Sequence, residues 1–164
     1  MSSSALSDHA DHRPDGQKPS MDRRSRAREL AMQALYQLDI QGDVVLAALR
    51  TFFIESGEDD MTRQLAEDWT LGAWKNLAAC DELIQKAAIR WELSRLSCVD
   101  RSILRLAVYQ LRFCPDIPGK VILNEAIELA KKFSGDQSPR FVNGVLDAIH
   151  KTLRLSSDSS RSKP

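Results

Sequence analysis

The sequence predicts an all-α protein, a compact bundle of six or seven helices. Apolar residues recur at helical spacing through most of the chain, and runs of β-branched residues are scarce. Only 7 of the 164 residues are glycine and 6% are aromatic, which also favours helix over sheet. With 43% hydrophobic residues, the chain is long enough for one domain with a hydrophobic core, or for two small helical halves packed together.

The two ends of the chain are predicted to be disordered tails. Residues 1–20 and 155–164 are rich in Ser, Asp and other polar residues and contain almost nothing to bury. The helical domain is therefore predicted to span residues 21–154. His9 and His12 in the first tail could hold a metal with two neighbouring aspartates, but a disordered segment supplies no fixed ligand geometry. No metal site is expected.

The first half of this domain contains three helical stretches. The first ends near Gly42, and its apolar stripe has the spacing i, i+3, i+4, i+7, i+8 and i+11. The stripe consists of Ala27, Leu30, Ala31, Ala34, Leu35 and Leu38. A shorter helix from Val44 to about Ile54 follows and is closed by a Ser-Gly-Glu-Asp-Asp loop. The third stretch runs from about Met61 to Trp91, and a break is expected near Asp81.

The second half contains three more helices. Ser97 is predicted to cap a helix from about Cys98 to Phe113, which a following proline stops. The next helix runs from about Val121 to Phe133. Ser138 followed by Pro139 is a typical helix start, a cap and then a first-turn proline, and predicts the last helix. The short loops favour antiparallel packing of neighbouring helices.

Positive charge is concentrated in one segment of an otherwise neutral chain. The formal net charge is zero, which excludes a uniformly basic surface for nucleic acid. Between Lys18 and Arg28, however, five cations and one acid give a local net charge of +4. Any anionic ligand is therefore expected at this cluster.

Arg24, Arg26 and Arg28 fall at the predicted start of the first helix. The helix dipole places partial positive charge there, so each cation is unfavourable by a few tenths of a kcal/mol, up to about 1. A phosphate bound at this position would make the electrostatic interaction energy favourable, because free N–H groups and guanidinium groups would both bind it. The segment indicates binding of RNA or another polyanion. A membrane surface and a solvated basic face without function are the alternatives.

Three aromatic residues are candidates for base stacking: Tyr36 in the first helix, Phe133 before a Ser-Gly-Asp-Gln loop, and Phe141 in the first turn of the last helix. Single-stranded bases commonly stack on such side chains, which contributes about 1 to 3 kcal/mol each. Taken singly, an aromatic residue at helical spacing is more often part of the core. Asp100 and Arg101 could contact a partner, although capping and surface charge explain them as well.

Nothing in the sequence indicates catalysis. A glycine-rich phosphate loop, a Cys/His zinc spacing and a nucleophile elbow are all lacking, so neither an enzymatic activity nor a cofactor is expected. Cys80, Cys98 and Cys114 are widely spaced, which is typical of reduced thiols. No apolar run approaches the roughly 18 residues of a membrane span, and the first residues lack the apolar stretch of a secretion signal. A cytoplasmic protein is expected.

Three segments together resemble the family of the bacterial transcription antitermination factor NusB. They are RRSRARELAMQALYQLD near the start, VDRSILRLAVYQL in the middle and KVILNEAIELAKKFSGDQSPRFVNGVLDAI near the end. The resemblance extends from about Arg23 to Leu153. It is most specific in NEAIELAKKF followed by FVNGVLD, whereas the arginine segment by itself is unspecific.

The resemblance implies an all-helical fold of two small packed helical subdomains and no enzymatic activity. It also implies a partner, the ribosomal protein NusE, because family members form a heterodimer with NusE that binds the boxA element of nascent ribosomal RNA. Together with RNA polymerase and other Nus factors, this complex suppresses premature termination. A free chain of this family can also form a homodimer that hides the arginine surface.

Position by position, the resemblance implies two groups of site residues. The implied RNA contacts are Arg24, Arg26, Arg28, Phe133, Gln137 and Phe141. The implied positions near the NusE or RNA surface are Tyr36, Asp100 and Arg105. Ser25 interrupts an arginine run that is often continuous in the family, and it is expected to weaken RNA affinity slightly. Gln137 stands where an acidic residue is common, and it is expected to remove a repulsion of phosphate.

Two alternative functions follow from the same features. A similar helical domain precedes the methyltransferase domain of some ribosomal RNA cytosine methyltransferases. This sequence contains no methyl-donor domain, so that alternative requires it to be a fragment of a longer protein. A helical module that binds only proteins is the other alternative. Salt dependence separates this alternative from RNA binding, because phosphate contacts make affinity fall steeply as salt rises.

Overall fold

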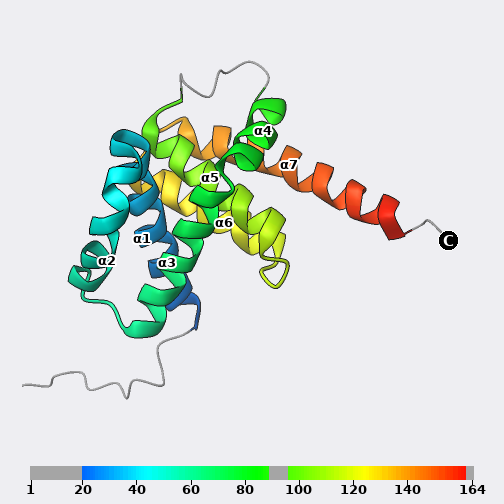
Figure 1. The fold of residues 1–164 in the computed structure, drawn as a ribbon. Helices are drawn as coiled ribbons and strands as arrows, with labels where there is room; N and C mark the ends of the chain where they lie inside the picture. Colours follow the sequence, from blue (N-terminus) through cyan, green and yellow to red (C-terminus); the bar gives the residue numbers. More distant parts are fainter. Residues whose placement is uncertain (1–19, 89–95, 162–164) are drawn as a thin grey trace, which may run out of the picture.

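The computed structural model describes residues 20–88 and 96–161, and within these two ranges the chain forms seven α-helices, one 3-10 helix and no strand. The elements are α1 (Ser20–Gln41), the 3-10 helix η1 (Gly42–Val45), α2 (Leu46–Glu55), α3 (Asp60–Lys75), α4 (Leu77–Ala87), α5 (Cys98–Phe113), α6 (Gly119–Phe133) and α7 (Ser138–Arg161) (Figure 1). The predicted all-α fold is confirmed, as is the predicted number of helices.

Helix α5 lies at the centre of the bundle (Figure 1). It packs against α1, α3, α4, α6 and α7, and every residue from Ser102 to Val108 is buried. A helix that is covered on nearly all sides belongs in the interior of a protein. Helix α5 joins the group formed by α1, α2 and α3 to the group formed by α6 and α7, which agrees with the two packed groups that the resemblance implied.

The apolar stripe predicted for the first helix is confirmed. All six of its residues are at most 4% exposed, and α1 packs against α3 and α5. Burial of a leucine side chain stabilises a fold by about 1.5 to 3 kcal/mol. The helix begins at Ser20, however, so Arg24 lies in its second turn and Arg28 in its third. The dipole effect fades within the first turn. The favourable interaction expected between a phosphate and the helix start therefore does not extend to these arginines.

The break in the third predicted stretch was placed wrongly. It lies at Asn76, between α3 and α4, and not near Asp81. The Asn76 Nδ2 atom donates to the Gly72 carbonyl (2.8 Å), and such a bond competes with helical backbone bonding. Asp81 stays within α4, where its carboxylate accepts two hydrogen bonds from Arg105. The end of the predicted stretch, residues 89–91, lies outside the described residues.

The last helix is longer than the sequence predicted. Helix α7 continues to Arg161 and projects from the body of the molecule (Figure 1), whereas a disordered tail was expected from residue 155. Residues 155–159 are all exposed, so this part of the helix has no apolar spacing that would reveal it. Of the first predicted tail, only Ser20 lies within the described residues. Among the described helices, none combines the length and apolar character needed to cross a membrane.

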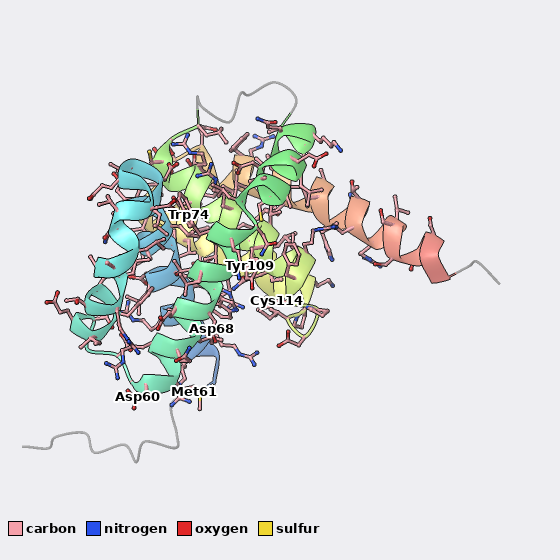
Figure 2. All side chains as sticks on the ribbon, in the orientation of Figure 1. Asp60, Met61, Asp68, Trp74, Tyr109 and Cys114 are labelled. Atoms are coloured by element: carbon pink, nitrogen blue, oxygen red, sulfur yellow. The ribbon has the colours of Figure 1, made fainter. Side chains whose placement is uncertain are left out.

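Two aromatic side chains, Tyr109 and Trp74 (both labelled in Figure 2), connect helix α3 to its neighbours. Tyr109 of α5 lies against Gly72, where a Cβ atom would come within 2.1 Å of the phenolic oxygen. The indole N–H of Trp74 donates to Asp43 Oδ1 of η1 (2.7 Å). A side chain at position 72 would therefore displace the ring of Tyr109.

Candidate nucleic-acid interface

The arginines of α1 lie in three different environments. Arg24 is exposed, and within the described part of the chain it has no ion pair or hydrogen bond. Arg26 is partly exposed and ion-paired, whereas Arg28 is only 2% exposed. Only Arg24 and Arg26 of the three therefore present positive charge at the surface.

Arg28 fastens α1 to three other helices. Its Nε donates to Gln110 Oε1 of α5 (3.2 Å), and its guanidinium lies 5.1 Å from the centroid of the Trp69 ring of α3. Its Nη1 is 3.9 Å from Glu125 Oε1 of α6. Burial lowers the pKa of Arg28, because the interior disfavours its charged form. The direct RNA contact that the resemblance implied would require this side chain to leave the core.

The acidic loop between α2 and α3 covers two cations of α1. Arg26 Nε donates to Glu58 Oε1 (2.8 Å), and Arg26 Nη1 lies 3.1 Å from Glu29 Oε1. Arg23 Nε donates to Asp59 Oδ2 (3.2 Å). The hydrogen bond with Glu58 raises the pKa of Arg26. Any phosphate that binds Arg26 must therefore compete with carboxylates of the chain itself.

An open groove of about 460 Å³ lies between α1 and α6. It is lined by Ser25, Glu29, Glu125, Glu128, Leu129, Lys131 and Lys132. Ser25 donates to Glu125 (2.7 Å), and Lys132 pairs with Glu29 (2.9 Å). Three carboxylates and two lysines make the groove a poor phosphate site compared with the unpaired Arg24. Ser25, which interrupts the arginine run, thus faces an acid of α6.

Phe133, Gln137 and Phe141 lie around the loop between α6 and α7. Gln137 is exposed, and its carbonyl accepts a hydrogen bond from the Phe141 N–H (3.2 Å). Both phenylalanine rings are half-buried and pack against the hydrophobic core. The Lys132 ammonium lies 5.3 Å from the Phe133 ring centroid. A partly exposed ring that the core holds in place is suited to stacking against a base.

Two serines tie this loop to Asp100: Ser134, which the sequence analysis did not single out, and Ser138, which it named only as a helix cap. Ser134 Oγ donates to Asp100 Oδ1 (2.7 Å), and Ser138 Oγ donates to Asp100 Oδ2 (3.0 Å). The two hydroxyl oxygens are 2.8 Å apart. The serines flank the loop, but they are 34 and 38 residues from Asp100 in the sequence, so no local pattern connects the three. The structure therefore joins Asp100 to the loop for which the resemblance implied RNA contacts.

Arg105 belongs to a buried ionic network and is only 7% exposed. Its Nε and Nη2 donate to the two carboxylate oxygens of Asp81 (2.8 and 2.9 Å), and its Nη1 donates to Asp39 Oδ1 (2.9 Å). Arg101 Nη2 donates to Asp39 Oδ2 (2.6 Å). Burial opposes ionisation of Asp39, but the bonds from Arg101 and Arg105 outweigh it and lower the Asp39 pKa. We call Asp39, Asp81, Arg101 and Arg105 the Arg105 network; it connects α1, α4 and α5.

Tyr36 is the most accessible of the three residues implied for the NusE or RNA surface. It is 37% exposed, and Ile40 on the following turn is 55% exposed. Val44 of η1 is 77% exposed. Tyr36 therefore lies near other exposed apolar side chains along the chain, whereas Arg105 lies in the interior.

The chain is similar to known proteins over most of its length. A model of the NusB family matches residues 25–151. The chain is 45% identical over 131 residues to the transcription antitermination protein NusB of Bacillus cereus (strain B4264), and the match covers 80% of this chain and 99% of that protein.

Solved structures show the same likeness. T. maritima NusB is 39% identical with a TM-score of 0.72, covering 78% of this chain and 90% of that one. A chain in a crystal structure of antitermination factors NusB and NusE in complex with double-stranded RNA is 28% identical, with a TM-score of 0.73. That match covers 80% of this chain and 98% of the other. The chain belongs to the NusB family.

Proposed function

We propose that the chain is an RNA-binding transcription antitermination factor without enzymatic activity. In this proposal it pairs with NusE, and the pair binds boxA of nascent ribosomal RNA and acts with RNA polymerase and other Nus factors in the cytoplasm. The observation that carries the proposal is the likeness to a chain crystallised with NusE and double-stranded RNA. The match covers 98% of that chain. The names of the curated relatives, transcription antitermination proteins, also support it.

The proposed RNA surface combines exposed cations with half-buried rings. Arg24 and Arg26 would bind phosphates, since guanidinium groups bind phosphate oxygens in a bidentate manner. Bases would stack on Phe133 and Phe141, and the exposed Gln137 would contact the RNA without repelling phosphate. Arg28 would contribute indirectly, because it holds α1 in place from inside the core.

The proposed partner surface is centred on the exposed Tyr36. A tyrosine beside other exposed apolar side chains is a typical component of a protein interface. Arg105 would support this surface from within, because it binds Asp39, one turn beyond Tyr36 on the same helix. In the absence of NusE, a homodimer that covers the arginine surface is part of the same proposal.

The test is a titration of fluorescently labelled boxA RNA with the full chain, alone and with purified NusE, at several salt concentrations. Tight binding is expected only with NusE, and the logarithm of the association constant should fall linearly with the logarithm of salt concentration. Arg24→Ala should reduce that slope by about one unit if it removes one phosphate contact. A single-stranded and a double-stranded probe of the same sequence should be compared.

The same titration separates the proposal from a module that binds only proteins. A pair that forms with NusE but binds neither RNA probe would favour the protein-binding alternative. Binding with no salt dependence would contradict phosphate contacts by the arginine segment.

A further inference from the structure

The loop between α6 and α7 is held by a ring of three short polar contacts. Asp100, Ser134 and Ser138 form this ring, with distances of 2.7, 3.0 and 2.8 Å, and we call it the Asp100 clasp. Hydrogen bonds from hydroxyl groups to a carboxylate are among the stronger ones in proteins. Because the two hydroxyl groups have only two hydrogens for three contacts, the carboxylate receives at least one of them in any arrangement.

The clasp is attached to the central helix of the bundle. Asp100 lies in the first turn of α5, where the helix dipole favours a negative charge. Its backbone N–H donates to the Ser97 side chain (3.1 Å), which caps the helix. The neighbouring Arg101 binds Asp39 of α1. The carboxylate is therefore fixed in place by the central helix and not by the loop that it holds.

Both ends of the loop meet at this single carboxylate. Ser134 directly follows Phe133, the last residue of α6, and Ser138 is the first residue of α7. Gln137 lies between the two serines, and Phe141 lies one turn after Ser138. The clasp thus sets the distance between the helix ends that carry the three residues proposed to contact RNA.

We propose that Asp100 is a positioning residue for RNA binding, which acts through Ser134 and Ser138 and not through a contact of its own. This inference rests on the proposed function. Both carboxylate oxygens of Asp100 already have partners within the chain. The clasp holds Phe133, Gln137 and Phe141 in the arrangement that binds RNA, so that less loop ordering is needed when the RNA arrives.

Loss of the clasp should leave the bundle folded. Backbone hydrogen bonds continue through the region: Ser134 N–H donates to the Ala130 carbonyl (2.9 Å) and Ser138 N–H to the Gly135 carbonyl (3.0 Å). These bonds do not involve the side chains of the clasp. A double variant Ser134→Ala with Ser138→Ala therefore removes the ring but keeps the Asp100 carboxylate available for any direct contact with a partner.

The experiment compares this double variant and Asp100→Asn with the unmodified chain in complex with NusE. Three quantities are measured: affinity for boxA RNA, affinity for NusE without RNA, and backbone amide exchange in residues 134–138. Both variants should bind RNA about tenfold more weakly, as expected for loss of charge-assisted hydrogen bonds. Amides of the loop should exchange faster, while the affinity of the double variant for NusE should stay within about twofold.

Matched controls separate positioning from general destabilisation. Ser156→Ala removes an exposed serine hydroxyl from α7, and Asp116→Asn removes an exposed carboxylate from another loop; both should leave all three quantities unchanged. Ser134→Thr keeps the hydroxyl group and should retain the RNA affinity that Ser134→Ala loses. The melting temperature of each variant checks that the fold is intact.

The outcomes distinguish failure of the clasp proposal from failure of the proposed function. If the unmodified complex binds neither RNA probe, the proposed function fails, and the clasp proposal fails with it. If the unmodified complex binds RNA and the double serine variant binds it equally well, only the clasp proposal is overturned. A loss of NusE affinity in Asp100→Asn, with unchanged loop exchange, would likewise assign Asp100 to a direct partner contact.

Discussion

Two of the regions in which arginine and carboxylate side chains meet, the Arg105 network and the Arg26–Glu58 pair, differ in depth. In the Arg105 network, the side chains of Arg105, Asp39, Arg101 and Asp81 are 9, 11, 13 and 21% exposed. At the start of α1, the Arg26 side chain is 43% exposed and its partner Glu58 is 18% exposed. The distances are similar, 2.6 to 2.9 Å in the network and 2.8 Å for the Arg26–Glu58 pair.

Because the two regions differ in depth, the same type of arginine–carboxylate ion pair has a different role in each. Breaking a buried pair leaves an uncompensated charge in the interior, which is strongly destabilising. An exposed pair contributes only about 0 to 1 kcal/mol, so its carboxylate can be replaced by another anion at little cost. The buried network therefore holds helices together, whereas the surface pairs are suited to exchange with a ligand.

The largest effect is expected from breaking the buried network. Arg105→Ala should lower the free energy of unfolding by about 3 kcal/mol, because Asp39 and Asp81 both lose a partner. Urea denaturation followed by circular dichroism measures this change. The control is Arg112→Ala, which removes an exposed arginine from the same helix and should change stability by less than about 0.5 kcal/mol. Equal effects of the two substitutions would contradict the structural role of the network.

The arginines of α1 allow the comparison to be made within one helix. Arg26→Ala should weaken RNA binding by about tenfold and reduce the salt slope by about one unit, while stability changes by less than about 1 kcal/mol. Arg28→Met removes a buried charge but keeps an apolar side chain, and it should leave the salt slope unchanged. A reduced slope for Arg28→Met would show that Arg28 reaches phosphate in the complex.

A smaller change, an increase in RNA affinity, is expected for a substitution in the acidic loop between α2 and α3. Glu58→Gln removes one of the two carboxylate partners of Arg26 and leaves Glu29, and it should tighten RNA binding by roughly two- to fivefold, in keeping with the strength of an exposed ion pair. Glu55→Gln, at the exposed end of α2, serves as the control because it removes the same charge without releasing an arginine. Similar gains in both variants would point to net charge and not to competition for Arg26.

The smallest effect is expected at the exposed Gln137. Gln137→Asp places a negative charge in the loop between α6 and α7, and it should weaken RNA binding by about two- to threefold at low salt through repulsion of phosphate. Gln85→Asp, on the exposed face of α4, provides a charge-matched control. Equal or tighter binding by Gln137→Asp would count against RNA at this loop.

The sequence by itself determined the local features of this protein. The apolar stripe of α1, the Ser97 cap and the start of α7 at Ser138 were all predicted, because each depends on residues within a few turns of one another. The positions of Phe133, Gln137 and Phe141 around one loop follow from the same local order. The exposed end of α7 was not predicted, because no apolar pattern continues through it. The break at Asn76 was not predicted, because it does not interrupt the apolar pattern.

Only the tertiary structure decided which charged side chains are available at the surface. Arg28 binds Gln110, which is 82 positions away, and Arg105 binds Asp39, which is 66 positions away. The sequence therefore shows where a charged residue stands in the chain, but not how deeply its side chain is buried. Asp100 meets Ser134 and Ser138 for the same reason, through the packing of α5 against α6 and α7. Burial determines whether a charge binds a ligand or supports the fold, and burial is a property of the packed bundle.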